Sequence, residues 1–227
     1  MRRLPPHGLA AHVCRSSRAR RAVWLVVAIT VVGCAAADRD RRSAPPIATA
    51  RAQAVGSQVM VDGVVTVAPR TFDDGFALQD ASGGIYVARA LDQAIELGSR
   101  VRVRGTLAAP DKRITVEPTA LQITGQGSAP APLEVATGDV GPATEGRLIA
   151  VRGRVAGAIV DDRPWGSKLY VNDGLGPLLV FIAAATSIDG TRYRAGQELR
   201  IVGFSGRFGD HTEVLPRGPS DIEAGPM

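Results

Sequence analysis

The sequence is poor in the two residues that most metal centres and many catalytic sites need. It contains two cysteines and three histidines in 227 residues, and beyond residue 33 only Cys34 and His211 remain. A zinc site built from Cys and His, a Cys-His nucleophile pair and a haem held through Cys-x-x-Cys-His all need more than this. We therefore expect no disulfide, no metal site, no cofactor and no catalytic activity.

Aromatic residues, lysines and long apolar runs are also scarce. Aromatic residues make up 4% of the chain, and lysine occurs only at positions 112 and 168. The apolar run from Ala22 to Val32 has 11 residues, whereas a membrane-spanning helix needs about 20. A basic stretch ending in Arg20-Arg21 precedes this run. Residues 1–33 are therefore predicted to be a signal peptide.

The end of this segment, Val31-Val32-Gly33-Cys34, resembles the bacterial lipobox. The resemblance implies cleavage before Cys34 and acyl chains, palmitate among them, on that cysteine, which would anchor the protein to a membrane of the cell envelope. Ala35 follows the cysteine, and in a bacterium with two membranes this implies the outer membrane, facing the periplasm or the cell surface. An ordinary signal peptide that happens to contain a cysteine is the alternative.

The net charge of the whole chain differs in sign from that of the chain after residue 33. The formal charge is +5, with a pI near 9.9, which favours a polyanionic partner. Six arginines and no acidic residue lie in residues 1–33, so the remaining chain has 21 basic and 22 acidic residues and a net charge of −1. Nonspecific binding of nucleic acid normally needs a basic excess. Any anion site must therefore be local.

One pattern of glycines and alternating apolar residues occurs twice. It runs from Gly56 to Val65 and again from Gly146 to Val155, 90 residues later; the offset is 93 between Asp80 and Asp173 and 98 between Gly98 and Gly196. Insertions between the blocks belong in loops. The predicted organisation is a lipidated cysteine with a flexible tether, a first domain, a Pro/Gly-rich linker, a second domain and a tail, with the respective bounds 34–53, 54–124, 125–143, 144–224 and 225–227.

Period-two alternation predicts five strands in each copy. A short helical or irregular segment separates the third and fourth strands, at 90–97 and again at 183–195. Gly63 and Gly153 interrupt long first strands, which is typical of a bulge that helps to close a small barrel. The predicted fold class is all-β with short helices: two tandem five-stranded Greek-key barrels of the OB-fold type after the signal peptide.

Three stretches carry a resemblance to a known class. Residues 59–65, 76–87 and 97–105 resemble the OB-fold domains of nucleic-acid-binding proteins, such as anticodon-binding and helicase-associated modules. The resemblance implies single-stranded nucleic acid as ligand. OB-folds also bind oligosaccharides and proteins, so these partners stay open.

OB-folds usually hold their ligand across strands two and three, between the loop joining strands one and two and the loop joining strands four and five. Alternation and loop position select aromatic and basic side chains there. The candidate ligand-binding residues are Arg70, Phe72, Tyr86, Lys112, Arg113, Arg163, Trp165, Lys168, Tyr170, Phe181, Arg207 and Phe208. Stacking of bases on such rings contributes about 1–3 kcal/mol each. The alternative is that Tyr86, Tyr170 and Phe181 pack against the other copy.

One acid pair lies in the first loop of each copy, Asp73-Asp74 in the first and Asp161-Asp162 in the second. Their spacing is not that of a calcium-binding loop, so we interpret them as solvated turn residues. The sequence as a whole favours a non-catalytic envelope lipoprotein whose tandem OB-folds bind an extended ligand, single-stranded nucleic acid first. The alternative is a protein-protein interaction or structural module of the envelope without a nucleic-acid ligand.

Overall fold

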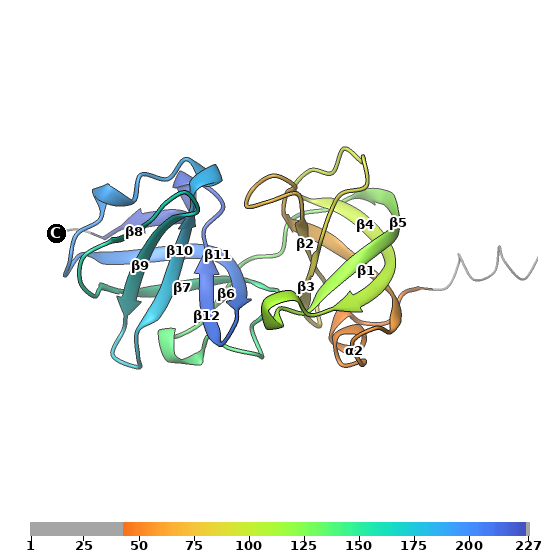
Figure 1. The fold of residues 1–227 in the computed structure, drawn as a ribbon, viewed down its shortest axis with the longest axis horizontal. Helices are drawn as coiled ribbons and strands as arrows, with labels where there is room; N and C mark the ends of the chain where they lie inside the picture. The colour runs from red at the N-terminus through yellow and green to blue at the C-terminus, as the bar shows by residue number, and fades with distance from the viewer. Residues whose placement is uncertain (1–42, 226–227) are drawn as a thin grey trace, which may run out of the picture. The chain divides into compact units, whose positions relative to one another are not determined.

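The computed structural model describes residues 43–225. The predicted signal peptide and Cys34 lie outside the described residues. Residues from Ala44 onward form one compact unit, which is mostly β (Figure 1). Within the described residues there is one α-helix, α2 (Ile47–Arg51). No helix in this part of the chain is long and apolar enough to cross a membrane.

The first copy forms a closed barrel of five strands. They are β1 (Gln58–Val67), β2 (Phe76–Gln79), β3 (Gly84–Val87), β4 (Ser99–Ala108) and β5 (Thr115–Gln126). The strand order around the barrel is β1-β2-β3-β5-β4. β3 and β5 are parallel, and the other neighbours are antiparallel. Five strands were predicted here, and this closed arrangement is that of an OB-fold.

Alternation fills the first barrel with small branched side chains. Val61, Val65, Leu78 and Ile85 are fully buried in one apolar cluster. The bulge predicted at Gly63 is wrong in position, because β1 pairs with β4 without interruption there and the register shift with β2 lies between Val65 and Val67. A side chain on Gly63 would place Cβ 3.1 Å from Leu78 Cβ. The glycine thus permits close approach of β2.

The prediction of a flexible tether is wrong for residues 47–51. These residues form α2, whose Ile47 and Ala50 are fully buried in the core of the first barrel. The Ile47 N–H donates to Asp80 Oδ2 at 2.9 Å, which holds the start of the helix against the turn after β2. A helix of five residues with two apolar positions is too short to produce a recognisable period in the sequence.

The second copy pairs its strands in the same cyclic order. Its main strands are β7 (Leu148–Val155), β9 (Gly166–Asn172), β10 (Leu178–Ala183), β11 (Glu198–Phe208) and β12 (His211–Leu215). The pairings run β7-β9-β10-β12-β11 and return to β7, with β10 and β12 parallel. This closed circuit is called the second barrel below. Short strands β6 (Leu133–Glu134), β8 (Val160–Asp162) and β13 (Ile222–Ala224) extend its sheet.

The segments between the third and fourth strands differ. Residues 90–97 contain turns and no helix. In the second copy, the corresponding segment holds two short 3-10 helices, Ala184–Thr186 and Gly190–Arg192. Both agree with the predicted short helical or irregular segments.

The predicted linker is largely part of the fold. β5 continues to Gln126 and β6 pairs with β7, so only residues 127–132 lack regular structure between them. A 3-10 helix at Thr137–Asp139 follows, and Thr137 N–H donates to Asp173 Oδ2 at 2.9 Å. This bond repeats that between Ile47 and Asp80, and the two donors are 90 residues apart. The repeated unit therefore begins upstream of residues 54 and 144.

A third apolar cluster joins the two barrels. It contains Val67, Ala77 and Tyr86 from the first barrel and Phe204 and Leu215 from the second. Polar contacts surround it: Leu148 N–H donates to Gln79 Oε1 at 2.8 Å, and the Arg51 guanidinium lies 3.1 Å from a Glu145 carboxylate oxygen. The backbones of Gly84 and Gly146 approach so closely that a Cβ on either glycine would collide with the carbonyl of the other.

Candidate functional site

The ligand face expected on the first barrel is covered by the second barrel. Tyr86 lies on β3 and does point away from its own core, but its side chain is only 2% exposed because it packs on Phe204. The two ring centroids are 5.5 Å apart. Tyr86 is therefore not available to a ligand. For Tyr86, the structure therefore confirms the alternative prediction, which was packing against the other copy.

The groups around Tyr86 hold it in this contact. Its hydroxyl donates to Asp73 Oδ1, and the Arg113 guanidinium carbon lies 4.3 Å from its ring centroid. Burial, followed by the hydrogen bond and charge of Asp73, raises the pKa of Tyr86 far above its ordinary value. Phe72 packs at the edge of the same cluster, with its ring 6.4 Å from that of Phe204. Phe72 and Arg113 thus contribute to the contact between barrels.

The remaining candidates on the first barrel lie in its loops. Arg70 is exposed, in the loop between β1 and β2. Lys112 is exposed and pairs with Asp210 of the second barrel, with Nζ 2.6 Å from Oδ1. Neither side chain lies on a strand. They do not extend a continuous ligand face on this barrel.

The register places four outward residues of the second barrel in one row. Tyr170 on β9 pairs with Leu179 on β10, Leu179 with Glu213 on β12, and Glu213 with Gly206 on β11. Residues directly opposite one another across paired strands share a face of the sheet. Tyr170 is 38% exposed, so the row is open to solvent at the residue that β9 contributes.

The residue pairs next to this row show that the first barrel covers part of the face. Lys168 pairs with Phe181, and Phe204 pairs with Leu215. Phe204, Leu215 and the partly buried Phe181 belong to the cluster that contacts the first barrel. Phe181 is thus largely committed to packing, as the alternative interpretation proposed, whereas Tyr170 is not. The first barrel covers one end of the face and leaves the other end open.

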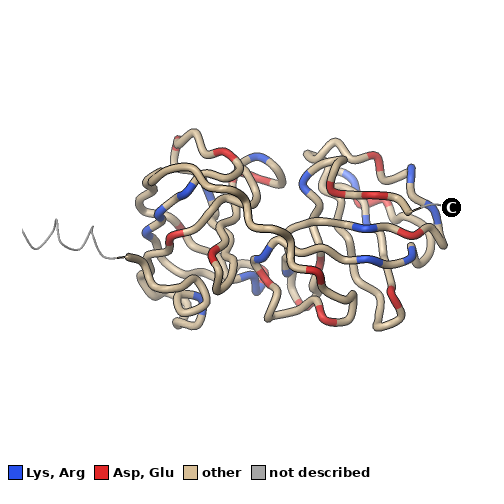
Figure 2. Tube along the Cα trace, turned by 180° about the vertical axis from the view of Figure 1, so that it is seen from behind, with Lys and Arg blue, Asp and Glu red and all other residues tan. Residues whose placement is uncertain are grey.

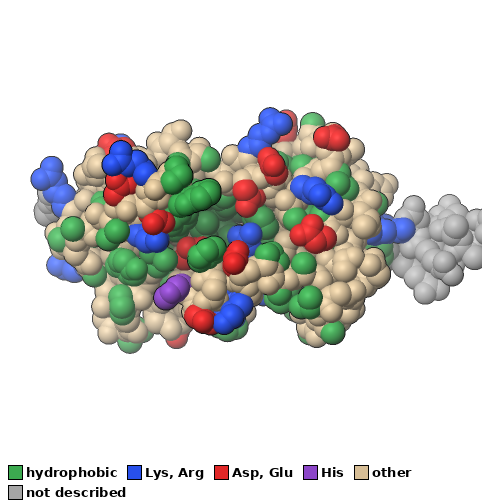
Figure 3. Space-filling model, in the orientation of Figure 1, with side chains coloured by type: hydrophobic (Ala, Val, Ile, Leu, Met, Phe, Trp, Pro, Cys, Tyr) green, Lys and Arg blue, Asp and Glu red, His purple; other side chains and the backbone are tan. Residues whose placement is uncertain are grey.

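Exposed apolar side chains border this face at two separate places, beside β8 and at the end of β11. Trp165 is 72% exposed in the turn between β8 and β9, and Phe208 is 63% exposed at the end of β11. Val160 on β8 is 50% exposed and pairs with Lys168. Figure 3 shows hydrophobic side chains gathered in the middle of this side of the molecule, with acidic and basic side chains among them. Leu179, Glu213 and Val160 were not among the predicted residues, although the same alternation places them here.

Acidic partners hold most of the cations at this face. Lys168 Nζ lies 2.9 Å from Asp162 Oδ2, and Arg163 donates to Asp161 Oδ2 at 2.7 Å. The hydrogen bond from Arg163 is the main reason that the pKa of Asp161 is lowered. Arg207 is half-buried on β11. Figure 2 shows both signs of charge distributed along the chain.

Glu213 is the buried acid of the face. Its residue is 8% exposed. Burial raises the pKa of its carboxyl, and the charges of Arg113 and Lys168 oppose that effect only in part. Among the described residues, no cluster of His, Cys, Asp or Glu could hold a metal ion. The open face therefore offers rings, a few paired cations and one buried carboxyl.

No protein-family model matches the sequence, and no curated protein matches it. Solved structures resemble the chain at low similarity. A murine DNA-binding protein bound to double-stranded DNA is 12% identical, with 74% of this chain and 97% of that chain covered and a TM-score of 0.38. A replication protein A heterotrimer bound to single-stranded DNA is 13% identical, with coverages of 76% and 49% and a TM-score of 0.31.

The single-stranded DNA-binding protein from Thermus aquaticus is 17% identical, with coverages of 77% and 95% and a TM-score of 0.24. At these identities and TM-scores, the likeness carries no argument about what this chain binds. The functional conclusion rests on the face itself.

Proposed function

We propose that this protein is a non-catalytic binding module of two tandem OB-folds, and that the open face of the second one binds single-stranded nucleic acid. The observation that carries the proposal is the exposure of three rings, Trp165, Tyr170 and Phe208, on and beside the strands where OB-folds hold extended ligands. A tryptophan exposed to this extent is costly without a partner.

The rings would supply most of the affinity. Stacking of a base on an aromatic side chain contributes about 1–3 kcal/mol, and it tolerates any base because each has a π-face. Phosphates would have to compete with Asp162 for Lys168 and with Asp161 for Arg163. We therefore expect modest affinity, little sequence preference and a shallow dependence on salt.

Only one of the two barrels would engage the strand. The equivalent face of the first barrel is occupied by Phe204 and Leu215. The footprint should thus be that of a single OB-fold, about 4–16 nucleotides. The first barrel would support the second and would not extend the site.

The place of action is proposed from the sequence. The lipobox resemblance at Val31-Val32-Gly33-Cys34 supports a lipoprotein held at the cell envelope, at the outer membrane if the organism has two membranes. The ligand face would then work close to a membrane surface.

A protein partner is the second candidate function. It is favoured by the pairing of Lys168 and Arg163 with acids beside exposed Val160 and Trp165, since apolar side chains ringed by paired charges are typical of protein interfaces. In that case the same face would bind an envelope protein, with no nucleic acid involved.

Fluorescence anisotropy distinguishes the two. The full-length chain, purified in mild detergent, is titrated into a labelled single-stranded oligonucleotide of about 16 nucleotides over a salt series. We expect Trp165→Ala to weaken binding at least about fivefold, the effect of one lost stacking contact. Val55→Ala, which removes an apolar side chain that is 60% exposed just before β1, should leave binding unchanged.

Absence of binding at low salt would contradict the nucleic-acid proposal. Crosslinking of a photoreactive residue at position 165 to an envelope protein would then support the second candidate.

A further inference from the structure

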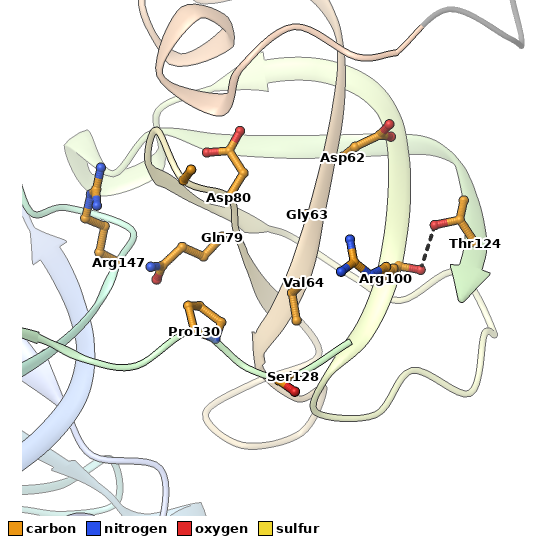
Figure 4. A pocket seen from close by; sticks show the side chains of 11 residues that line it. Asp62, Gly63, Val64, Gln79, Asp80, Arg100, Thr124, Ser128, Pro130 and Arg147 are labelled. Atoms are coloured by element: carbon orange, nitrogen blue, oxygen red, sulfur yellow. Dashed lines mark hydrogen bonds between the residues drawn. The ribbon is translucent and has the colours of Figure 1, made fainter. Parts of the chain in front are cut away.

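A second candidate site lies on the first barrel and shares no residue with the open face. It is a cavity of about 550 Å³, a size within the range of roughly 300–1,000 Å³ that small-molecule sites occupy. β1 contributes Gly63 and Val64, β2 contributes Gln79, and β4 contributes Arg100. Arg147 lines it from the segment before β7. In Figure 4, Gln79 and Gly63 lie between Arg147 and Arg100.

The acidic side chains in the wall are already satisfied. Asp80 accepts hydrogen bonds from the backbone of Ile47, Ser82 and Gly83 and from the Ser82 hydroxyl. Asp62 is held by Arg102 through two bonds of 2.7 Å each. Neither carboxylate needs a cation from a ligand.

The donors in the wall, by contrast, keep free N–H groups. Arg100 makes one side-chain hydrogen bond, from Nε to the Gln126 carbonyl at 3.4 Å, so both terminal nitrogens of its guanidinium are free of partners within residues 43–225. Arg147 donates from one terminal nitrogen to the Ser82 carbonyl. Gln79 accepts from Leu148 N–H through Oε1, which leaves its amide N–H₂ without a partner in the same part of the chain.

The excess of donors sets the charge of a matching ligand. Two guanidinium groups and one amide can donate to carboxylate or phosphate oxygens, and hydrogen bonds from charged donors are about twice as strong as neutral ones. Val64, Ala81 and Pro130 supply apolar wall beside these donors. The lining therefore fits an anionic group attached to an apolar body better than it fits a bare ion.

We propose that this cavity binds a small organic anion, a molecule that presents a carboxylate or phosphate to the guanidinium of Arg100 and an apolar part to Val64 and Pro130, with Gln79 and Arg147 offering donors to a further polar group at the opposite side of the cavity. Arg100 lines the cavity from β4, and Arg147 lines it from the second copy. The site therefore needs both barrels in their observed contact. It is independent of the open face, since its lining includes none of the exposed rings.

Isothermal titration calorimetry on the full-length chain tests the proposal. The probes are benzoate, phenyl phosphate and inorganic phosphate, with benzamide as the neutral counterpart of benzoate, each up to about 10 mM. We expect at least one organic anion to bind more tightly than inorganic phosphate and benzamide not to bind. Failure of both organic anions to bind, or equal binding of benzamide, would overturn the proposal. Inorganic phosphate binding as tightly as both organic anions would also overturn it.

Variants locate the binding. Arg100→Gln should weaken binding of the organic anion about tenfold, because a charged donor is lost. Arg152→Gln removes the same charge from an exposed position on β7 outside the cavity, so it should change nothing. Unfolding midpoints of both variants check that the fold is kept. If Arg100→Gln leaves binding of the organic anion unchanged, the anion binds elsewhere, and the assignment of the site to this cavity is overturned. Loss of oligonucleotide binding in Trp165→Ala has no bearing on this outcome.

Discussion

The ring of Tyr86 in the first barrel packs against the ring of Phe204 in the second, with centroids 5.5 Å apart and planes inclined by 53°. Tilted aromatic pairs at this separation attract beyond the area they bury. The contact converts what would be the ligand face of the first barrel into an internal interface. It leaves the second barrel to present the open face.

This packing predicts a large difference between two phenylalanines of one strand. Phe204→Ala should destabilise the protein by about 3–5 kcal/mol, since Phe204 is 1% exposed and its removal leaves a cavity beside Tyr86. Phe208→Ala, four residues along β11 and 63% exposed, should change stability by no more than about 0.5 kcal/mol. Urea unfolding measures both. A loss of stability in Phe204→Ala as small as that in Phe208→Ala would mean that the contact between the barrels contributes little to stability.

The close approach of Gly84 and Gly146 gives a second prediction. A methyl group at Gly84 would collide with the Gly146 carbonyl, so Gly84→Ala should cost about 1–3 kcal/mol and separate the barrels locally. Gly141→Ala is the matched control, because no atom lies within 4 Å of a Cβ built there. Thermal unfolding and the exchange rate of the Leu148 amide, which bonds to Gln79, report the two effects. A Gly84→Ala protein as stable as the Gly141→Ala protein would contradict the observed approach.

Glu213 predicts a specific pH dependence. Burial raises the pKa of its carboxyl above the ordinary 4.5. The native state therefore holds the proton more tightly than the unfolded state. The protonated Glu213 therefore contributes to the free energy of unfolding. This contribution is fully present below about the ordinary pKa and is lost as the pH rises through the higher native pKa.

Glu213→Gln should remove that part of the pH profile. The variant should be more stable than the natural chain at neutral pH. The advantage should shrink as the pH falls through the raised native pKa toward 4.5, and it should be constant below 4.5. Denaturant unfolding at a series of pH values gives the comparison. A constant difference between the two proteins across that range would show that Glu213 does not titrate differently in the folded state.

Asp80 predicts how firmly α2 is held. Asp80→Ala leaves the N–H of fully buried Ile47 without its partner, which should cost about 1–3 kcal/mol and speed exchange of the Ile47 amide. Asp189→Ala removes a similar turn carboxylate that bonds only to Thr191 in an exposed loop, so it should not affect that amide. Unchanged protection of Ile47 in the Asp80 variant would refute the role assigned to this bond.

The same carboxylate gives a dependence on acid. Burial acts to raise the pKa of Asp80, but hydrogen bonds from Ser82, Ile47 and Gly83 outweigh it and the pKa is lowered below 3.8. Its contribution is therefore present above pH 3.8 and is lost as the pH falls through the native pKa. Protection of the Ile47 amide should decline in acid in the natural chain and be independent of pH over that range in Asp80→Ala.

Much of the fold follows from the sequence because its signals are local. Alternation in stretches such as Val59–Val65 requires one face of a strand to be buried, and turn glycines mark where the strands end. The repetition of this pattern at an offset of 90 predicted the same strand order for both copies. What the sequence could not show was α2, since Ile47 and Ala50 are buried by contact with strands far along the chain.

The site depended on tertiary structure for the same reason. Alternation places Tyr86 and Tyr170 equally on outward faces, and it does not distinguish a face that meets solvent from one that meets another barrel. The sequence by itself determined which side chains leave each core. Only the packing of the two barrels decided that Tyr86 is buried against Phe204 while Tyr170 stays exposed, because that outcome depends on contacts between residues more than a hundred positions apart.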